Sequence, residues 1–339
     1  MSDSSSRDIA SNAWVEVDFS PDPGYQLIFD GIHGREELGR PFLYEIDLSS
    51  GTLRGDIGKL VGTSATTWLS QSDENVEDRF FNGIVTRVVS TGLVAGAYRY
   101  RVEVRPWIWL LTRVTDCRIY QNQSAFQIIT KLFRDAGFSD FKDGRQGGAG
   151  DSVLEYCVQY RETSFDFVTR LMEQFGLYYF FQHDRGQHTL VIADDPNAHD
   201  TLDDAIPFVF DQTEFRTVAD HIWEWHTDLG LHSGKFTFRD YNFTTPSADL
   251  TAKTVQNASH PYGNLEVYEY PGPYDDTGVG QGMTDVRMQA ISMNRTLVDA
   301  VSNARGLHPG WRFNLTHHPE RTVNRDYLIT RAEWSMSIA

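Results

Sequence analysis

Hydrophobic and polar residues alternate along several short stretches in the first third of the chain. The alternation is clearest at residues 98–105, YRYRVEVR, where every second residue is charged. Because successive side chains of a β-strand point to opposite faces, one face of this stretch is apolar and the other is charged. The apolar face holds Tyr98, Tyr100, Val102 and Val104, and the charged face holds Arg99, Arg101, Glu103 and Arg105. The pattern predicts a strand with one buried and one polar face.

Residues 12–115 contain more segments of this kind. Residues 14–19, WVEVDF, place Val15, Val17 and Phe19 on one side, and glycine and serine separate the later segments as they do in turns. Many short alternating strands predict a barrel or a sandwich. We interpret this part as a first β-barrel domain.

Residues 116–200 mix helical and strand patterns. Residues 124–137, SAFQIITKLFRDAG, begin with a capping serine, end with glycine and carry apolar residues at helical spacing. The expected buried positions are Phe126, Ile129, Leu132 and Phe133. Residues 177–194 then predict a hairpin, with LYYFFQ and HTLVIAD joined by the turn HDRGQ. This part is therefore expected to be a mixed α+β domain.

A second helix is predicted within residues 159–181, QYRETSFDFVTRLMEQFGLYYFF. Thr163 or Ser164 suits the N-cap, Asp166 suits the first turn, and Gly176 suits the C-terminal end. The expected buried stripe is Phe165, Val168, Leu171, Met172 and Phe175. The two helices align without a gap at an offset of 39 residues, the difference between positions 163 and 124. Either a unit is duplicated, or two capped amphipathic helices resemble each other because caps and periodicity demand it.

Residues 201–339 return to strand patterns. Residues 234–243 alternate, residues 280–293 suit a short helix, and residues 306–319 and 327–338 each predict a strand. We interpret this part as a second β-barrel domain with a short helical insert. The predicted fold is therefore α+β and β-rich, with two barrels joined by a mixed domain.

Composition and charge narrow the possible partners. The chain has 339 residues, of which 40% are hydrophobic, which is enough for two or three packed units. Its 30 basic and 47 acidic residues give a net charge of −17. This balance argues against nucleic acid and anionic membrane surfaces as partners. Residues 184–228 are especially acidic, but the cluster 194–205 lacks the offsets of a calcium loop and is expected to be solvated.

The N-terminus and the cysteines suggest a reduced, cytoplasmic protein. Residues 1–11 are polar and are expected to be disordered, with no apolar core of a signal peptide. No run of residues approaches the length of a membrane span. Cys117 and Cys157 cannot form a disulfide framework, and we expect both to be buried, reduced thiols.

Motifs that would carry catalysis are missing from the sequence. The closest histidine pairs are His183 with His188, His221 with His226, and His317 with His318, and none has the spacing of a metal motif. No GxSxG, GxGxxG or Walker motif occurs, and the glycine-rich residues 144–150 lack a Lys-Ser end. Trp107 and Trp109 are expected on one strand face, in the core. We predict no catalytic, cofactor-binding or metal-binding residue, although composition alone leaves a pair of glycosidase carboxylates open.

Five segments, in order, resemble conserved blocks of VgrG, the spike protein of type VI secretion. They are GIHGREELGRPFLYEIDLSS (31–50), PWIWLLTRVTDCRIYQNQSAFQII (106–129), VQYRETSFDFVTRLMEQFGLYYFF (158–181), YEYPGPYDDTGVG (268–280) and LHPGWRFNLTHHPERTVNRDYLIT (307–330). The resemblance covers residues 12–335. In VgrG, this region is similar to the central hub of contractile phage tails.

The resemblance implies a structural protein rather than an enzyme. In that family three copies form a cylinder that presents six barrels, which matches a threefold spike to the sixfold tube of the haemolysin-coregulated protein (Hcp). It implies a homotrimer that also contacts the baseplate and effector or adaptor proteins. It also implies a location in the bacterial cytoplasm until firing exports the spike. Other members continue into an OB-fold and a β-helix, so the chain is expected to be truncated or a hub-only relative.

Two alternatives stay open. A prophage or contractile-tail baseplate hub would share the mechanism, and genome neighbourhood would separate it from a secretion spike. A carbohydrate-acting hydrolase is the weaker alternative, because it needs two carboxylates at catalytic separation that the sequence cannot locate.

Overall fold

The computed structural model describes residues 14–70, 78–209, 220–256, 260–293 and 295–337. Strands predominate, and three α-helices lie in the middle and later parts of the chain. The expected disordered segment 1–11 lies outside the described residues, as does part of the acidic segment 184–228. The prediction of a β-rich α+β fold is confirmed for the part that is described.

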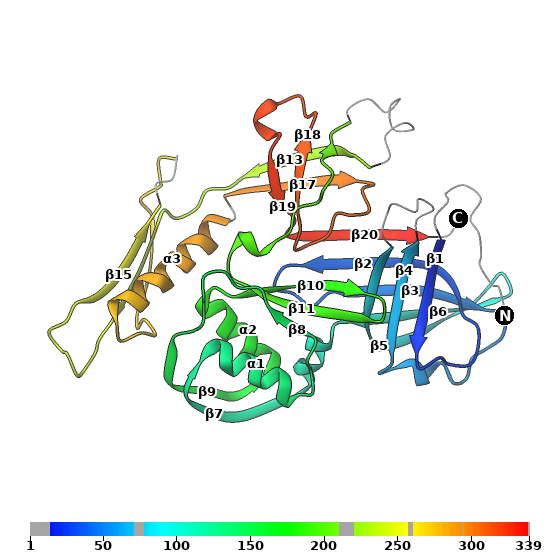
Figure 1. The fold of residues 1–339 in the computed structure, drawn as a ribbon, viewed down its shortest axis with the longest axis horizontal. Coiled ribbons are helices and arrows are strands. Elements are labelled where there is room, and N and C mark those ends of the chain that lie inside the picture. Colours follow the sequence, from blue (N-terminus) through cyan, green and yellow to red (C-terminus); the bar gives the residue numbers. More distant parts are fainter. Residues whose placement is uncertain (1–13, 71–77, 210–219, 257–259, 294, 338–339) are drawn as a thin grey trace.

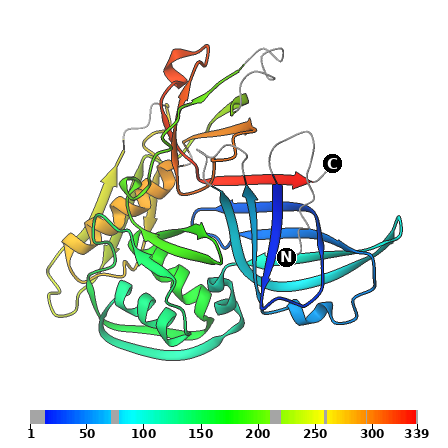
Figure 2. The same cartoon turned by 45° about the vertical axis from the view of Figure 1, so that its right-hand side comes forward.

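Seven strands form one curled antiparallel sheet, which we call the half-barrel (Figures 1 and 2). In sheet order the strands are β1 (Trp14–Ser20), β4 (Ser64–Ser70), β5 (Arg79–Val94), β6 (Ala97–Arg105), β3 (Leu43–Ser50), β2 (Ile28–Glu37) and β20 (Arg331–Ser337). Each neighbouring pair is antiparallel. The sheet ends at β1 and β20 without pairing them, so it is curled but not closed.

The alternation in β6 sets the two faces of this sheet, as predicted. Tyr100, Val102 and Val104 are fully buried in the core. On the other face, Arg101 donates two hydrogen bonds to the carboxylate of Asp47, at 2.8 and 3.0 Å. The charged face of the strand is therefore neutralised largely by neighbouring strands of the same sheet.

The C-terminal residues return to the half-barrel. Residues 327–338 were expected to form one strand, but they contain the short β19 (Asp326–Leu328) and the separate β20. Strand β20 pairs with β2, and Trp334 lies opposite Gly34. Trp334 and Met336 of β20 pack against the core of the first sheet. Residues 331–337 thus lie with the first part of the chain rather than with residues 201–330.

Two helices pack on a two-stranded ribbon of β7 (Thr115–Ser124) and β9 (Val153–Thr163). Helix α1 (Ala125–Asp135) has a capping box in which Ser124 and Gln127 bond reciprocally. Helix α2 (Ser164–Phe175) is capped by Thr163 and ends at Gly176, whose φ is 73°. Both predicted helices are confirmed.

The buried stripe of α2 differs at one position from the prediction. Phe167 is fully buried, whereas Phe165 is only half-buried. Ser164, Val168, Leu171 and Phe175 follow each other at three- and four-residue steps, and Phe167 completes that face next to Val168. The buried face of α2 is therefore confirmed, but its aromatic residue is Phe167 rather than Phe165.

The correspondence between α1 and α2 extends beyond their caps. Asn122 and Arg161, two residues before each cap, both have a φ of 53°. Thr130 and Thr169 each donate from the hydroxyl to the carbonyl four residues earlier. Since neither capping nor amphipathicity requires the left-handed residue, this match favours a duplicated strand–helix unit over chance resemblance.

The predicted hairpin joins this unit to the half-barrel. Strands β10 (Tyr178–Asp184) and β11 (Gln187–Ala193) pair antiparallel, and β8 (Phe141–Asp143) adds parallel to β11. Short 3-10 helices occur at Ile57–Leu60, Trp107–Arg113, Pro196–Ala198 and Arg321–Val323. In Figures 1 and 2 the hairpin lies between the half-barrel and the two helices.

The third part of the chain forms three small sheets. They are β12 (Ile206–Pro207) with β18 (Arg312–Thr316) and β19, β13 (Ile222–Leu229) with β17 (Thr296–Ser302), and β15 (Leu250–Val255) with β14 (Lys235–Asp240) and β16 (Glu266–Glu269). Helix α3 (Thr277–Met293) packs on the last of these sheets and is longer than the expected insert, because Asp276 caps it earlier. These sheets do not join into one closed barrel within the described residues. The second β-barrel expected from the sequence therefore stays a prediction.

Candidate interaction surfaces

The histidine pairs do not converge on a metal site. Within the described ranges no group of three or more His, Cys, Asp or Glu could hold a metal ion. His183 and His188 face each other across the β10–β11 hairpin, but both rings are hydrogen-bonded to protein atoms. His221 is buried just before β13, and His226 is exposed within that strand. Among the helices described, none is long and apolar enough to cross a membrane.

The two cysteines have different surroundings. Cys157 is buried, and burial raises the pKa of its thiol. Cys117 is exposed, so the expectation that both are buried was wrong. Cys117 lies on the outer face of the β7–β9 ribbon, and the helices cover only the other face.

Trp107 and Trp109 do not share a strand face. They lie in the 3-10 helix Trp107–Arg113, which begins at Pro106. Trp107 is buried and stacks on Phe138 with the ring centroids 4.7 Å apart. Trp109 is half-buried beneath the guanidinium of Arg113, 4.3 Å from the ring centroid. The core assignment therefore holds for Trp107, while the strand assignment was wrong because proline begins a tight turn there.

The glycine-rich segment 144–150 encloses a carboxylate of the protein itself. The carboxylate of Asp194 accepts hydrogen bonds from the backbone N–H groups of Gln146, Gly147 and Ala149, at 2.7, 3.0 and 3.0 Å. Successive backbone N–H groups form such a concave anion site. Asp194 was expected in a solvated acidic loop, but it holds this segment against the end of β11.

Buried polar side chains connect the half-barrel to the β10–β11 hairpin; we call this set the junction network. It comprises Glu36, Tyr44, Arg79, Asn82, His183, His188 and Trp334. Nε2 of His188 accepts from the backbone N–H of Trp107 at 2.9 Å, so the neutral ring carries its proton on Nδ1 and donates to Asn82 Oδ1 at 2.7 Å. Nδ1 of His183 accepts from the backbone N–H of Asn82 at 3.1 Å, which leaves Nε2 to donate to the Tyr44 hydroxyl at 3.0 Å.

Burial determines the charge states in this network. It lowers the pKa of His188 to about 4 and lowers the pKa of His183 well below its ordinary value. Burial, together with the nearby Glu36 carboxylate, raises the pKa of Tyr44 well above 10. Glu36 also accepts from Nε1 of Trp334 at 3.0 Å, which ties β20 to the same network. The network thus fixes the half-barrel on the hairpin through neutral histidines rather than offering a reactive group.

One exposed surface lies on the outer face of the β7–β9 ribbon. Its residues are Cys117, Ile119 and Gln121 on β7, and Tyr156, Val158 and Tyr160 on β9. Ile119 and Tyr160 are each 63% exposed. Helices α1 and α2 cover only the inner face, so this outer face carries large apolar side chains into solvent (Figure 1). Clusters of this kind often mark protein contacts.

A second exposed surface lies on residues 222–301, which we call the arm. Twelve of the 22 large apolar side chains that are exposed among the described residues belong to it. In its β13–β17 ribbon, Asp228 and Leu229 are both exposed, as are Thr296 and Leu297 opposite them. Since consecutive residues point to opposite faces, both faces of this ribbon are open there. An isolated two-stranded ribbon is marginally stable in water, so a partner surface is expected to cover it.

Comparison with known proteins identifies the family. The model of the phage tail baseplate hub (GPD) matches residues 35–337. The chain belongs to this family. The hub region is also 40% identical over 323 residues to the type VI secretion system spike protein VgrG1b of Pseudomonas aeruginosa, covering 94% of this chain and 43% of that protein. The resemblance to VgrG seen in the sequence is thereby confirmed.

Solved structures share the hub fold. The E. coli c3393 protein, a component of the type VI secretion system similar to T4 tail proteins gp27 and gp5, has a TM-score of 0.70 at 19% identity and covers 95% of this chain and 73% of its own. The 43 kDa tail protein of prophage MuSo2 from Shewanella oneidensis has a TM-score of 0.68 at 13% identity and covers 96% and 95%. The chain spans less than half the length of the curated relatives it matches.

The sequence alone predicts no interface residues, and the structure supplies candidates. Tyr156 and Tyr160 share a strand face with exposed Ile119, which becomes visible only once β7 and β9 are paired. The available sequence signal was the run Tyr156, Val158, Tyr160 at alternate positions, with no charged residue on that side. The same signal is typical of core strands, so sequence alone does not separate the two cases.

Proposed function

We propose that this hub is a structural component of the type VI secretion spike, acting as a homotrimer that joins the hexameric Hcp tube to the puncturing part of the spike. The observation that carries the proposal is the 40% identity to a type VI spike protein over nearly the whole chain. In this role the hub also contacts the baseplate and carries effector or adaptor proteins. It resides in the bacterial cytoplasm until the system exports it, and it acts as a scaffold rather than an enzyme.

The trimer contact is proposed to lie on the arm. Leu229 and Leu297, at one end of the β13–β17 ribbon, are exposed on a ribbon that lacks a third strand among the described residues. Burying such side chains contributes about 25 cal/mol per Å² of apolar area. A closed ring of three copies would cover the ribbon in every copy. In the same assembly residues 201–330 would complete the second barrel, residues 12–115 with β20 would form the first, and residues 116–200 would lie between them.

A prophage tail hub is the second candidate. It is supported by the similarity to the MuSo2 tail protein, whose fold covers nearly all of both chains. Both functions use the same hub geometry and differ in the tube protein that the hub meets. Direct mixing with each tube protein therefore separates them.

Light scattering tests the proposal. The chain would be measured alone and mixed with Hcp rings, and we expect a trimer that elutes together with the ring. Leu229→Asp with Leu297→Asp should shift the trimer toward monomer, since each places a charge in the proposed contact. The control is Leu53→Asp outside the arm, because the exposed fraction of Leu53, 63%, lies between the 75% of Leu229 and the 40% of Leu297. A chain that stays monomeric would contradict the proposed homotrimer, and a trimer indifferent to the arm substitutions would contradict the arm contact. A trimer that ignores Hcp rings would favour the tail hub.

A further inference from the structure

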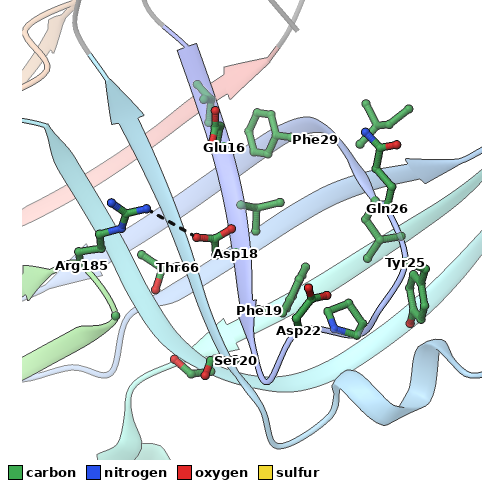
Figure 3. A pocket seen from close by; sticks show the side chains of 17 residues that line it. Glu16, Asp18, Phe19, Ser20, Asp22, Tyr25, Gln26, Phe29, Thr66 and Arg185 are labelled. Atoms are coloured by element: carbon green, nitrogen blue, oxygen red, sulfur yellow. Dashed lines mark ion pairs between the residues drawn. The ribbon is translucent and has the colours of Figure 1, made fainter. Parts of the chain in front are cut away.

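The half-barrel has one free strand edge beside a cavity. Strand β1 pairs with β4 on one side, and within the described residues no strand pairs with its other side. A cavity of about 1100 Å³ lies against this free edge (Figure 3). Its lining includes β1 from Val15 to Ser20, most of the segment 22–29 beyond the free edge, Ser64 and Thr66 of β4 on the paired side, and the hairpin turn at Arg185 and Gly186. We call this cavity the seam groove.

Strands β1 and β20 do not close the sheet, because the two edges cross instead of lying alongside each other (Figure 1). Seven strands that are antiparallel in succession leave the first and the last running in the same sense. Figure 1 shows β20 running across the view while β1 runs down it, so the two edges do not lie alongside each other. A further strand on the free edge of β1 would run opposite to β1 and continue the antiparallel order. Such a strand lies about 4.8 Å from its neighbour, which requires an open groove of this kind.

The side chains of β1 specify what the groove accepts. Val15, Val17 and Phe19 are half-buried and point to the inner side, packed against the core. Glu16 and Asp18 alternate with them and are exposed. An added strand would therefore place every second side chain on an apolar floor and the others beside carboxylates.

The rim of the groove is acidic. Glu16, Asp18 and Asp22 line it, and Arg185 is the one cationic side chain among the described residues of the lining. Arg185 lies 4.0 Å from Asp18, and both side chains are largely exposed, so the pair is weak. Figure 3 shows this ion pair and places Glu16 farther up β1, away from Arg185. The rim thus keeps negative charge available for a ligand.

We propose that the seam groove binds an extended segment of a partner protein in which apolar residues alternate with lysine or arginine. The segment adds to β1 as an antiparallel strand, its backbone bonding the free edge, its apolar residues on Val15, Val17 and Phe19, and its basic residues beside Glu16 and Asp18. Strand addition of this type takes affinity from the backbone and specificity from alternate side chains. The site is separate from the arm, and it does not depend on the trimer.

Charge argues against a second copy of this chain as the occupant. The chain carries a net charge of −17, and the edge itself bears Glu16 and Asp18. Like charges on facing edges disfavour pairing, which is how edge strands avoid joining their own kind. A partner strand that carries lysine or arginine is instead attracted by the same carboxylates.

Labelled peptides test the proposal on the full chain. The probe alternates valine and lysine over seven residues, the length of β1. One comparison peptide alternates valine and glutamate, and another keeps the lysines but has proline at the centre, which cannot form a continuous strand ladder. We expect fluorescence anisotropy to show binding of the first peptide alone. Hydrogen exchange of the amides of residues 14–20 should slow on binding.

Matched variants separate the groove from general attraction to an acidic protein. Glu16→Lys with Asp18→Lys should weaken binding of the valine–lysine peptide at least about tenfold, while Asp203→Lys with Asp204→Lys, an exposed pair elsewhere with the same charge change, should leave it within about twofold. The proposal is overturned if the proline peptide binds equally, if the two double variants behave alike, or if no peptide binds. It is also overturned if the amides of β1 that point away from β4 are already protected without peptide, since the chain itself or a second copy then fills the groove.

Discussion

His188 donates a hydrogen bond from Nδ1 to Oδ1 of Asn82 at 2.7 Å, across 106 residues of sequence. The amide group of Asn82 completes the contact by donating to Thr66 Oγ1 at 2.8 Å and to Ser64 Oγ at 3.1 Å. One buried asparagine therefore holds β4 and the β10–β11 hairpin to β5. Buried polar groups of this kind are costly to leave without partners, which makes the contact between the two parts specific.

Asn82→Ala should lower the free energy of unfolding by about 3 kcal/mol, because it leaves the Nδ1–H of His188 and two hydroxyl groups without their partner. Urea denaturation followed by circular dichroism measures this change. Asn314→Ala is the control, since Asn314 is exposed and makes one side-chain bond, to Asp326, and should cost less than about 1 kcal/mol. Equal losses in the two variants would mean that the junction network does not hold the half-barrel to the hairpin.

Acid should weaken the same junction. The pKa of His188 is lowered to about 4 by burial, below the ordinary value of 6.5 that applies to the unfolded chain. Between these values the unfolded state binds a proton that the folded state does not, so stability is complete above pH 6.5 and falls as the pH approaches 4. The loss is about 3 kcal/mol for this residue. His183 and His308, whose pKa values are also lowered by burial, act in the same direction.

Thermal unfolding between pH 7.5 and 4.5 measures this loss. His188→Gln removes the titrating ring and should flatten the fall of Tm relative to the unsubstituted chain. His226→Gln, at an exposed position, should leave the slope unchanged. Carboxylates contribute equally to all three proteins, so only the difference in slope is informative. Identical slopes in all three would show that His188 is not held neutral by the fold.

Local patterns predicted much of this fold. The caps at Ser124 and Thr163, the hairpin of β10 and β11, and the two faces of β6 each depend on residues close in sequence, and each is confirmed. Caps and alternation act within a few residues, so a single sequence carries the information.

Features that depend on distant contacts were not predictable in the same way. Strand β20 joins β2 from the opposite end of the chain, and Asn82 meets His188 only after both sheets have formed. Cys117 is exposed because no described residue covers the outer side of the β7–β9 ribbon, although its sequence pattern suits a buried strand equally well. The candidate surfaces lie where a strand lacks a neighbour, and that is a property of topology rather than of local sequence.

Gly34→Val should detach β20 from the half-barrel. A Cβ atom at position 34 would lie 2.3 Å from the indole ring of Trp334, so the ring must move and lose its bond to Glu36. We expect a loss of about 3 kcal/mol in unfolding free energy and faster hydrogen exchange in residues 331–337. Gly51→Val is the control, because a Cβ there meets no atom within 4 Å. Unchanged exchange in residues 331–337 of the Gly34 variant would contradict the assignment of this strand to the first sheet.

The correspondence between the two strand–helix units predicts similar energetic roles for their two caps. Ser124 accepts from the backbone N–H of Gln127 at 3.2 Å, and Thr163 accepts from that of Asp166 at 3.0 Å. Each substitution by alanine should therefore cost about 1 kcal/mol of unfolding free energy. Since β7 and β9 are antiparallel, the caps lie at opposite ends of the ribbon, and the double variant should lose about the sum of the two single losses. Ser139→Ala, at an exposed residue outside both helices, is the control and should be nearly neutral. A loss from only one cap would mean that the two units resemble each other in geometry but do not share the energetic role of the cap.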